Sequence, residues 1–237
     1  MYSVGTAVVV TRPSYLSFVQ NAMLGFGDLY GYAAAQSGLE LRGRGAAYVI
    51  EAPGGQWVVR RYFRGGGVAR LVKESYVRFG EPRPIRELRV SAVARSRGIS
   101  TPEVVAAIVY GSGPMYRADL ATKYVPDSVD LVELTFDRED ANLAAAWRAT
   151  GGLIRQLAKA GIRHMDLNMK NVLITGSQNR PHAWVLDLDR ATVRAKGRAD
   201  AEAMFRRLQR SIEKWERRRG VRVPAALRLE LERGLGD

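Results

Sequence analysis

His164-Met165-Asp166-Leu167-Asn168-Met169-Lys170-Asn171 is the densest run of chemically capable polar side chains in this chain of 237 residues. It follows a predicted long helix and precedes an apolar stretch that predicts a strand. A second polar group, Asp187-Leu188-Asp189, comes at the end of a further predicted strand. Carboxylates and an amide at the ends of neighbouring strands offer oxygen ligands suited to Mg²⁺, and one carboxylate remains to orient a hydroxyl group.

The spacing within the first run, H-x-D-L-x-x-x-N, is typical of the catalytic loop of protein kinases, in which a later aspartate binds the metal ion. A polar loop that only caps helices and forms turns is the alternative. The eight-residue match with a second aspartate behind it favours the catalytic interpretation, because both parts of the pattern occur in the required order.

The sequence before this run predicts a β-rich segment. Glycines and prolines separate short apolar stretches, and Pro53-Gly54-Gly55 is a strong hairpin turn signal. We expect strands and turns through the first third of the chain, and one helix that follows Pro84 and ends at Gly98. The predicted strands are 5–11, 46–51, 56–63, 104–110 and 118–125.

The sequence after residue 126 predicts more helix. Asp137 is the expected N-cap of a long helix that ends at Gly161, and 198–219 has a second helical pattern with Met204, Leu208, Ile212 and Trp215 on one side. The stretches 172–175 and 183–188 predict short strands. The pattern indicates an α+β fold with a β-rich N-terminal lobe over 1–126 and an α-rich C-terminal lobe over 127–237.

Composition narrows the class of protein. The net charge is +13 and the chain has no cysteine, which excludes disulfide frameworks, thiolate zinc sites and cysteine nucleophiles. The basic excess predicts an anionic partner: nucleic acid, nucleotide, acidic lipid or phosphorylated sugar. Since no segment approaches the roughly 20 apolar residues of a membrane helix, we expect a soluble or peripheral protein inside the cell.

The motifs support a closer resemblance. HMDLNMKNVLI followed by WVLDLDRA resembles the bacterial 3-deoxy-D-manno-octulosonic acid (Kdo) kinases of the lipopolysaccharide kinase group. Upstream, LRGRGAAYVI, WVVRRYFRGG, RELRV and YRADLATKYV are similar to the same family in the same order. The resemblance covers roughly residues 40–215.

This resemblance implies a compact, eukaryotic-like (protein-kinase-like) two-lobe fold that uses ATP and Mg²⁺. The implied reaction is phosphorylation of a Kdo hydroxyl, the 4-position in the family, on a Kdo-lipid A precursor during assembly of the lipopolysaccharide inner core. The implied location is the cytoplasmic face of the bacterial inner membrane, as a peripheral protein. No nucleic acid and no obligate protein partner are expected.

The same resemblance assigns roles in the catalytic run. Asp166 matches the catalytic aspartate that orients the attacking hydroxyl, and Asn171 and Asp187 match the metal ligands. We expect His164 to brace the loop. Lys170 lies where it can approach the transferred phosphate, although a solvated lysine fits the sequence as well. The role of Asn168 stays open, and so does that of Asp189, which replaces a kinase glycine.

The N-terminal lobe of a kinase requires a cation for the ATP phosphates and an acid that orients it. Glu87, in the helix after Pro84, is the expected acid, although any buried salt bridge would fit it too. Strand alternation puts Arg60 and Arg61 on opposite faces, and the resemblance favours Arg60. The phosphate loop is reduced to Gly43-Arg44-Gly45, which predicts a phosphate contact or a plain turn.

The last predicted helix lies in a strongly basic segment. Residues 194–219 contain ten Lys or Arg and four Asp or Glu. The apolar side of such a helix usually packs on the core. We also predict that its polar side can lie against anionic lipid headgroups, which makes the anionic membrane surface an expected partner.

Three alternatives stay open from the sequence. A heptose kinase of the lipopolysaccharide core would share the fold, and substrate profiling must separate it. A small atypical protein kinase is disfavoured because only about 50 residues follow Asp187, with no A-P-E motif. A basic nucleic-acid-binding protein agrees with the charge, but the sequence lacks a zinc signature and an RNP-like aromatic strand.

Overall fold

The computed structural model describes residues 1–37, 39–41, 46–62, 76–77, 80–111, 115–138, 142–176, 180–194 and 199–236. The chain forms two compact units, one of residues 1–89 and 103–124 and the other of residues 90–102 and 125–237. The segment 90–102 therefore belongs to the second unit, although it precedes two strands of the first. Among the described residues, no helix is long and apolar enough to span a membrane.

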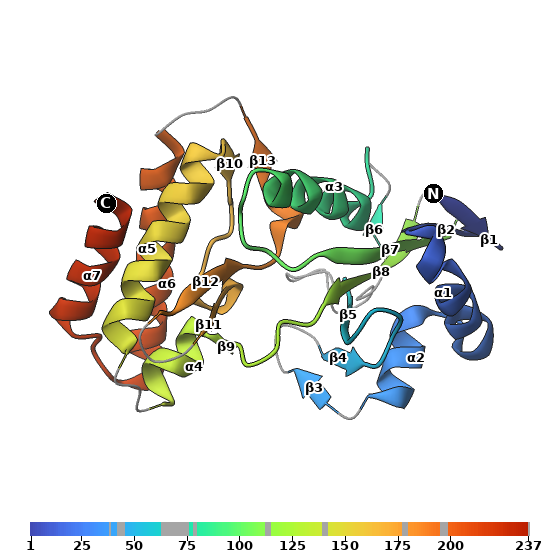
Figure 1. Cartoon of the computed structure of the whole chain (residues 1–237), viewed down its shortest axis with the longest axis horizontal. Helices are drawn as coiled ribbons and strands as arrows, with labels where there is room; N and C mark the ends of the chain where they lie inside the picture. Colours follow the sequence, from blue (N-terminus) through green and yellow to red (C-terminus); the bar gives the residue numbers. More distant parts are fainter. Residues whose placement is uncertain are drawn as a thin grey trace. The chain divides into compact units, whose positions relative to one another are not determined.

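The first unit is built on an antiparallel sheet (Figure 1). Its strand order is β1-β2-β7-β8-β5-β4-β3, and β6 also pairs with β8. Alternation along β5 directs Trp57 and Val59 to one face and Val58 and Arg60 to the other. The strands are β1 (Tyr2–Val4), β2 (Ala7–Thr11), β3 (Leu39–Leu41), β4 (Ala47–Ile50), β5 (Trp57–Arg61), β6 (Tyr76–Val77), β7 (Val104–Tyr110) and β8 (Met115–Lys123).

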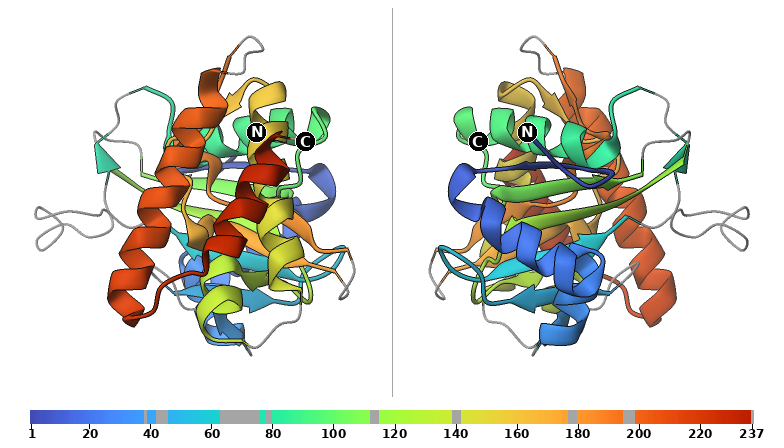
Figure 2. Two further views of the ribbon diagram at one scale, coloured as in Figure 1. Left: turned by 90° about the vertical axis from the view of Figure 1, so that its left-hand side faces the viewer. Right: turned by 90° about the vertical axis from the view of Figure 1, so that its right-hand side faces the viewer.

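Two helices near the N-terminus pack on one face of this sheet, where Figure 2 shows them in blue. They are α1 (Pro13–Phe26) and α2 (Leu29–Gln36). The prediction of only strands and turns in the first third was therefore wrong. Pro13 at the first turn and the Asp28 cap, which accepts a hydrogen bond from Gly31 N, are helix start signals that the strand pattern obscured. Trp57 at 0% exposure anchors this face.

Helix α3 (Arg83–Ser96) follows Pro82 and ends before Gly98, whose φ is 78°. Its first half contributes Ile85 and Leu88 to the opposite face of the sheet. The left-handed backbone at Gly98 explains why the helix ends there, because glycine adopts that conformation without steric cost.

The second unit contains four further helices among the described residues: α4 (Leu131–Phe136), α5 (Leu143–Lys159), α6 (Ala199–Arg219) and α7 (Ala225–Gly236). The prediction that Asp137 caps one long helix was wrong. Asp130 caps α4 by accepting from Val132 N and Glu133 N, and Asp137 ends α4, while α5 begins after Asn142. The carboxylate of Asp137 instead pairs with Arg219, 2.7 Å away.

Short strands complete the second unit. One small sheet has the order β12-β11-β9, and a two-stranded sheet joins β10 to β13. The apolar side of α6, with Met204, Leu208 and Ile212 at 0–1% exposure, packs into the same core as α5. The strands are β9 (Val129–Asp130), β10 (Ile162–Arg163), β11 (Val172–Thr175), β12 (His182–Val185) and β13 (Thr192–Val193).

Helix α7 lies along α5, as Figures 1 and 2 show within this unit. The approach is close because glycines lie at the contact. A Cβ atom on Gly151 would clash with the carbonyl oxygen of Leu231, and one on Gly234 would clash with the carbonyl oxygen of Arg148. Backbone therefore packs directly on backbone where these two helices meet.

Candidate active site

The run 164–171 forms a loop that leaves β10 and ends in a single 3-10 turn, η2 (Met169–Asn171). Leu167 and Met169 are fully buried and anchor the loop in the core of the second unit. Asp166, between these anchors and His164, keeps 13% of its side chain exposed. Alternate burial thus fixes the backbone and leaves the Asp166 carboxylate at the edge of the core.

His164 connects this loop to the chain before Asp187. Its Nδ1 accepts a hydrogen bond from Asp166 N at 3.2 Å, and its Nε2 lies 2.9 Å from the carbonyl oxygen of Leu186. Because Nδ1 accepts a hydrogen bond, it carries no proton, and because a carbonyl oxygen can only accept, Nε2 must donate. The two contacts together therefore require the tautomer with the proton on Nε2. The imidazole is 2% exposed and therefore ties two backbone segments together from inside the core.

Two amide side chains fasten the Asp166 carbonyl. Asn168 Nδ2 donates to it at 2.9 Å, and Asn171 Nδ2 donates to it at 3.1 Å. Asn168 also caps η2, because its Oδ1 accepts from Lys170 N at 3.0 Å. The structure thus gives Asn168 a structural role that the sequence left open. The Asn171 bond fixes its amide so that Oδ1, a potential metal ligand, points away from the Asp166 carbonyl.

Asp187 lies just beyond β12, where its backbone takes the left-handed conformation with φ 60° and ψ 61°. This conformation is uncommon for a residue other than glycine and concentrates at functional sites, although aspartate tolerates it better than most. Leu186 N donates to the Asn171 carbonyl at 2.9 Å, so the segments that carry Asp187 and Asn171 are hydrogen-bonded neighbours. Asp189, in η3 (Leu188–Arg190), is 3% exposed.

Helix α6 packs alongside the loop 164–171 and contacts it at three successive positions. Met204 Sδ contacts His164 N at 3.3 Å, and Ser211 Oγ accepts from Met169 N at 3.2 Å. Between them, Arg207 forms an ion pair with Asp166 Oδ1. The sequence analysis did not single out Arg207, which the structure brings to Asp166. The available signal was its helical spacing, three residues after the apolar Met204 and hence on an adjoining side.

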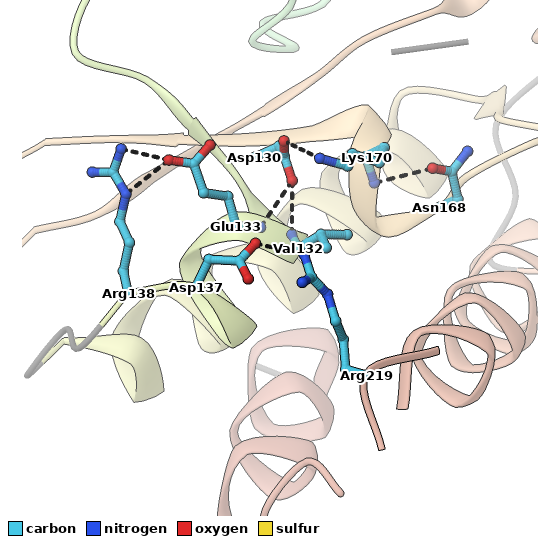
Figure 3. A network of polar contacts seen from close by, with 8 residues as sticks. All are labelled: Asp130, Val132, Glu133, Asp137, Arg138, Asn168, Lys170 and Arg219. Carbon is cyan, nitrogen blue, oxygen red and sulfur yellow. Dashed lines mark hydrogen bonds and ion pairs between the residues drawn. The ribbon is translucent and has the colours of Figure 1, made fainter. Parts of the chain in front are cut away.

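Lys170 points toward α4, as the close-up in Figure 3 shows. Its ammonium group lies 2.8 Å from Asp130 Oδ2, while Asp130 Oδ1 caps the helix. Lys170 also lies 5.8 Å from the centre of the Trp215 ring, on α6. In this structure Lys170 is therefore neither fully solvated nor unpaired, and 42% of its side chain is exposed.

In the first unit, Arg60 of β5 meets Glu87 of α3. Arg60 Nη2 is 2.6 Å from both carboxylate oxygens, and the Tyr62 hydroxyl donates to Glu87 Oε2. Glu87 is 4% exposed, whereas the Arg60 side chain is 29% exposed. A buried acid thus orients a partly exposed cation, which is the arrangement that the kinase interpretation requires of these two positions.

Arg61 has a different environment. Its side chain is 8% exposed and pairs with Asp28, 2.6 Å away, and with Asp119, 3.0 Å away. Burial alone would lower the pKa of Arg61, but the hydrogen bonds that Arg61 donates to Asp119 and Asp28 outweigh it and raise that pKa further above its usual range. Asp119 also accepts from Tyr30 N and from the Tyr110 hydroxyl, so the group ties α2 to the sheet. These contacts assign Arg61 a structural role.

The remaining predicted contact, Gly43-Arg44-Gly45, lies outside the described residues.

Comparison with known proteins shows which family the chain resembles. The sequence pattern of the "Lipopolysaccharide kinase (Kdo/WaaP) family" matches residues 34–226. A 3-deoxy-D-manno-octulosonic acid kinase of Stenotrophomonas maltophilia is 33% identical over 181 residues, which are 76% of this chain and 70% of that protein. The protein of the same name from Xanthomonas axonopodis pv. citri is 34% identical, over 73% of this chain and 68% of that protein. The one from Vibrio cholerae is 32% identical, over 76% of this chain and 74% of that protein.

Among solved structures, "WaaP in complex with acyl carrier protein" matches with a TM-score of 0.60 at 17% identity, over 97% of this chain and 88% of that one. At this identity the likeness speaks for the fold alone. It confirms the predicted α+β, protein-kinase-like fold class.

Proposed function

Because this chain belongs to the lipopolysaccharide kinase (Kdo/WaaP) family, we propose that it transfers the γ-phosphate of ATP to a hydroxyl group of a Kdo sugar. That the chain is a kinase of lipopolysaccharide biosynthesis follows from the family itself. The observation that carries the finer proposal is the similarity to Kdo kinases over about three quarters of the chain. The proposed acceptor is the 4-hydroxyl of Kdo on a lipid A precursor.

Asp166 is the proposed catalytic residue. Its carboxylate accepts a hydrogen bond from the attacking hydroxyl and aligns that oxygen with the γ-phosphorus. The new oxygen–phosphorus bond forms while the bond from phosphorus to ADP breaks, and the hydroxyl proton passes to Asp166. The hydrogen bonds of His164, Asn168 and Asn171 to the Asp166 backbone support this role, because they restrict where the carboxylate can lie.

Asn171 and Asp187 are the proposed ligands of Mg²⁺. Both offer oxygen donors, as this hard cation requires, and the Asn171 amide is already oriented by its bond to the Asp166 carbonyl. The donor set therefore fits the metal. Bound Mg²⁺ would neutralise phosphate oxygens of ATP.

Arg60 is the proposed contact for the ATP phosphates, with Glu87 as the positioning residue. The guanidinium is partly exposed and can bind phosphate through two parallel N–H groups. Lys170 and the Gly43-Arg44-Gly45 segment stay proposed contacts of the nucleotide. For Lys170 the pair with Asp130 is a competing partner that phosphate would have to displace.

We place the protein at the cytoplasmic face of the bacterial inner membrane, where its glycolipid acceptor would lie. The exposed side of α6 supports this proposal through Lys214, Arg217 and Arg218, each exposed to solvent. Basic residues near an anionic surface each contribute about 1 kcal/mol of attraction. Flotation with liposomes should show binding that rises with the anionic lipid fraction; equal binding to neutral liposomes would contradict the membrane proposal.

The test of the reaction is phosphate transfer from ATP to a Kdo-bearing lipid A precursor, read by mass spectrometry of the product. We expect transfer by the unaltered chain, and a loss of at least ~100-fold in Asp166→Asn, which keeps the shape of the side chain but not its basicity. Asp187→Asn should lose activity in the same assay.

Asp127→Asn is the matched control. Asp127 is exposed and, like Asp187, has a left-handed backbone, so the variant makes the same chemical change at a similar φ of 52°. It should keep full activity. Undiminished transfer by Asp166→Asn would refute the role of Asp166, and transfer to a heptose acceptor without transfer to Kdo would refute the proposed substrate.

A further inference from the structure

Arg207 reaches the catalytic aspartate from a distant part of the sequence. It lies on α6, on an edge between Met204 and Ser211, both of which contact the loop 164–169. One of its amino groups pairs with Asp166 Oδ1. The helix thus holds a cation at the carboxylate that the attacking hydroxyl would approach.

The exposures of the two partners differ. Arg207 keeps 43% of its side chain exposed, whereas the Asp166 side chain is 13% exposed. A guanidinium group has five N–H donors in a planar fork, and the pair with Asp166 Oδ1 is made through one nitrogen. Donors are therefore left on the solvent side for a second anion.

The structural explanation for this ion pair is weak. An ion pair with one partner as exposed as Arg207 contributes little to folding, because water screens it and the long side chain loses rotamer freedom. The loop is also already fastened by His164, Asn168 and Asn171. The geometry is better explained by binding, since one guanidinium can contact Asp166 and a further carboxylate at the same time.

Lys170 adds positive charge to the same loop. It is 42% exposed above a mostly buried partner, Asp130, whose side chain is 17% exposed. Arg207 and Lys170 are thus each more exposed than their acidic partners. An acidic acceptor is attracted to such a surface, whereas a neutral sugar gains nothing from it.

We propose that Arg207 binds the carboxylate of the acceptor sugar next to Asp166 and so selects acidic acceptors. The inference rests on the proposed function for the identity of that sugar, because Kdo carries a carboxylate. One N–H group of Arg207 stays on Asp166 while others bind the acceptor, which holds the sugar hydroxyl close to its base.

The test measures binding and transfer separately. Free Kdo and its methyl ester are titrated calorimetrically into the full chain and into Arg207→Gln, Arg207→Lys and Arg206→Gln. Arg206 is the matched control, since it is the adjacent helix residue, is 55% exposed and pairs with Glu202 rather than with the loop. Thermal unfolding should agree within a few degrees for all four proteins.

We expect Arg207→Gln to weaken Kdo binding about 10- to 100-fold, the effect of losing a charge-assisted hydrogen bond, and to leave the weaker binding of the ester unchanged. Arg207→Lys should be intermediate, because it keeps the charge without the planar fork. Arg206→Gln should bind as the unaltered chain does.

Equal losses for Kdo and its ester, or no loss for either, would overturn the inference, and so would absence of Kdo binding by the unaltered chain at millimolar concentration. The transfer assay separates the two proposals. Arg207-dependent Kdo binding without phosphate transfer would refute the proposed function and leave the carboxylate subsite standing.

Discussion

Replacing Gly151 by alanine should separate two helices that pack backbone against backbone. Its Cβ atom would fall well inside van der Waals contact of the Leu231 carbonyl oxygen, 2.8 Å from Leu235 N and 3.0 Å from the Gly234 carbonyl carbon. These atoms belong to the backbone of α7 and cannot rotate away as a side chain can. The helix itself must therefore move by roughly 1 Å to restore normal carbon–oxygen contact.

The magnitude follows from what that movement exposes. Overpacking of a tight interface costs about 1–3 kcal/mol by itself. Loosening α7 also exposes part of Leu227 and Leu231, which are 8% and 1% exposed, and full burial of each contributes about 1.5–3 kcal/mol. We therefore expect Gly151→Ala to lower the free energy of unfolding by about 2–5 kcal/mol.

Gly152 provides the control in the next residue. A Cβ atom there would find its nearest neighbours at 4.0 Å, an ordinary contact, so Gly152→Ala should stabilise the helix by about 0.5–1 kcal/mol. Urea unfolding followed by circular dichroism and by tryptophan fluorescence, to which the buried Trp147 on α5 contributes, measures both variants. Equal stabilities for the two variants would refute the close packing of α5 and α7.

Three further outcomes follow. Asp119→Asn should lower the free energy of unfolding by about 3–5 kcal/mol in urea, because it breaks a mostly buried ion pair with Arg61. A cost below about 1 kcal/mol would contradict that network. Burial alone would raise the pKa of Glu216, but the hydrogen bond from Val223 N and the ion pair with Arg228 outweigh burial and lower that pKa. The contribution of Glu216 to the stability of the fold should therefore be fully present above the ordinary glutamate pKa of about 4.3. It should be lost as the pH falls through the lower pKa of the folded state. Glu216→Gln should make the free energy of unfolding fall less steeply as the pH is lowered. An unchanged dependence on pH would count against this role of Glu216. Glu87→Gln should raise the KM for ATP about tenfold with a smaller change in kcat, since Arg60 loses its ionic partner, and an unaltered KM would remove Glu87 from the site.

Sequence patterns worked best where local chemistry and burial agree. The strands 104–110 and 172–175 were predicted with the bounds that the structure has, because both are continuous apolar runs between turn signals. The apolar side of α6 was also predicted with its correct residues, since they recur at helical spacing. Alternation along β5 correctly separated Arg60 from Arg61.

The same patterns failed where an element depends on partners elsewhere. Helices α1 and α2 carry aromatic residues that suit strands, and their packing around Trp57 favours the helical conformation. The break at Asp137 depends on the Asp130 cap and on the pair with Arg219. Helix α7 was not predicted. Its position depends on the close contact of its backbone with the glycines of α5, which the local sequence pattern does not reveal.

The sequence alone determined which residues are proposed for the candidate site. Asp166, Asn171 and Asp187 were predicted from residue type and spacing, both of which can be read along the chain. Only the tertiary structure decided which partners these residues have. Arg207 lies 41 positions from Asp166, and Asp130 lies 40 positions from Lys170, and such pairs form only when folding closes the chain between them. Ion pairs depend on distance in space, and no local pattern records that distance.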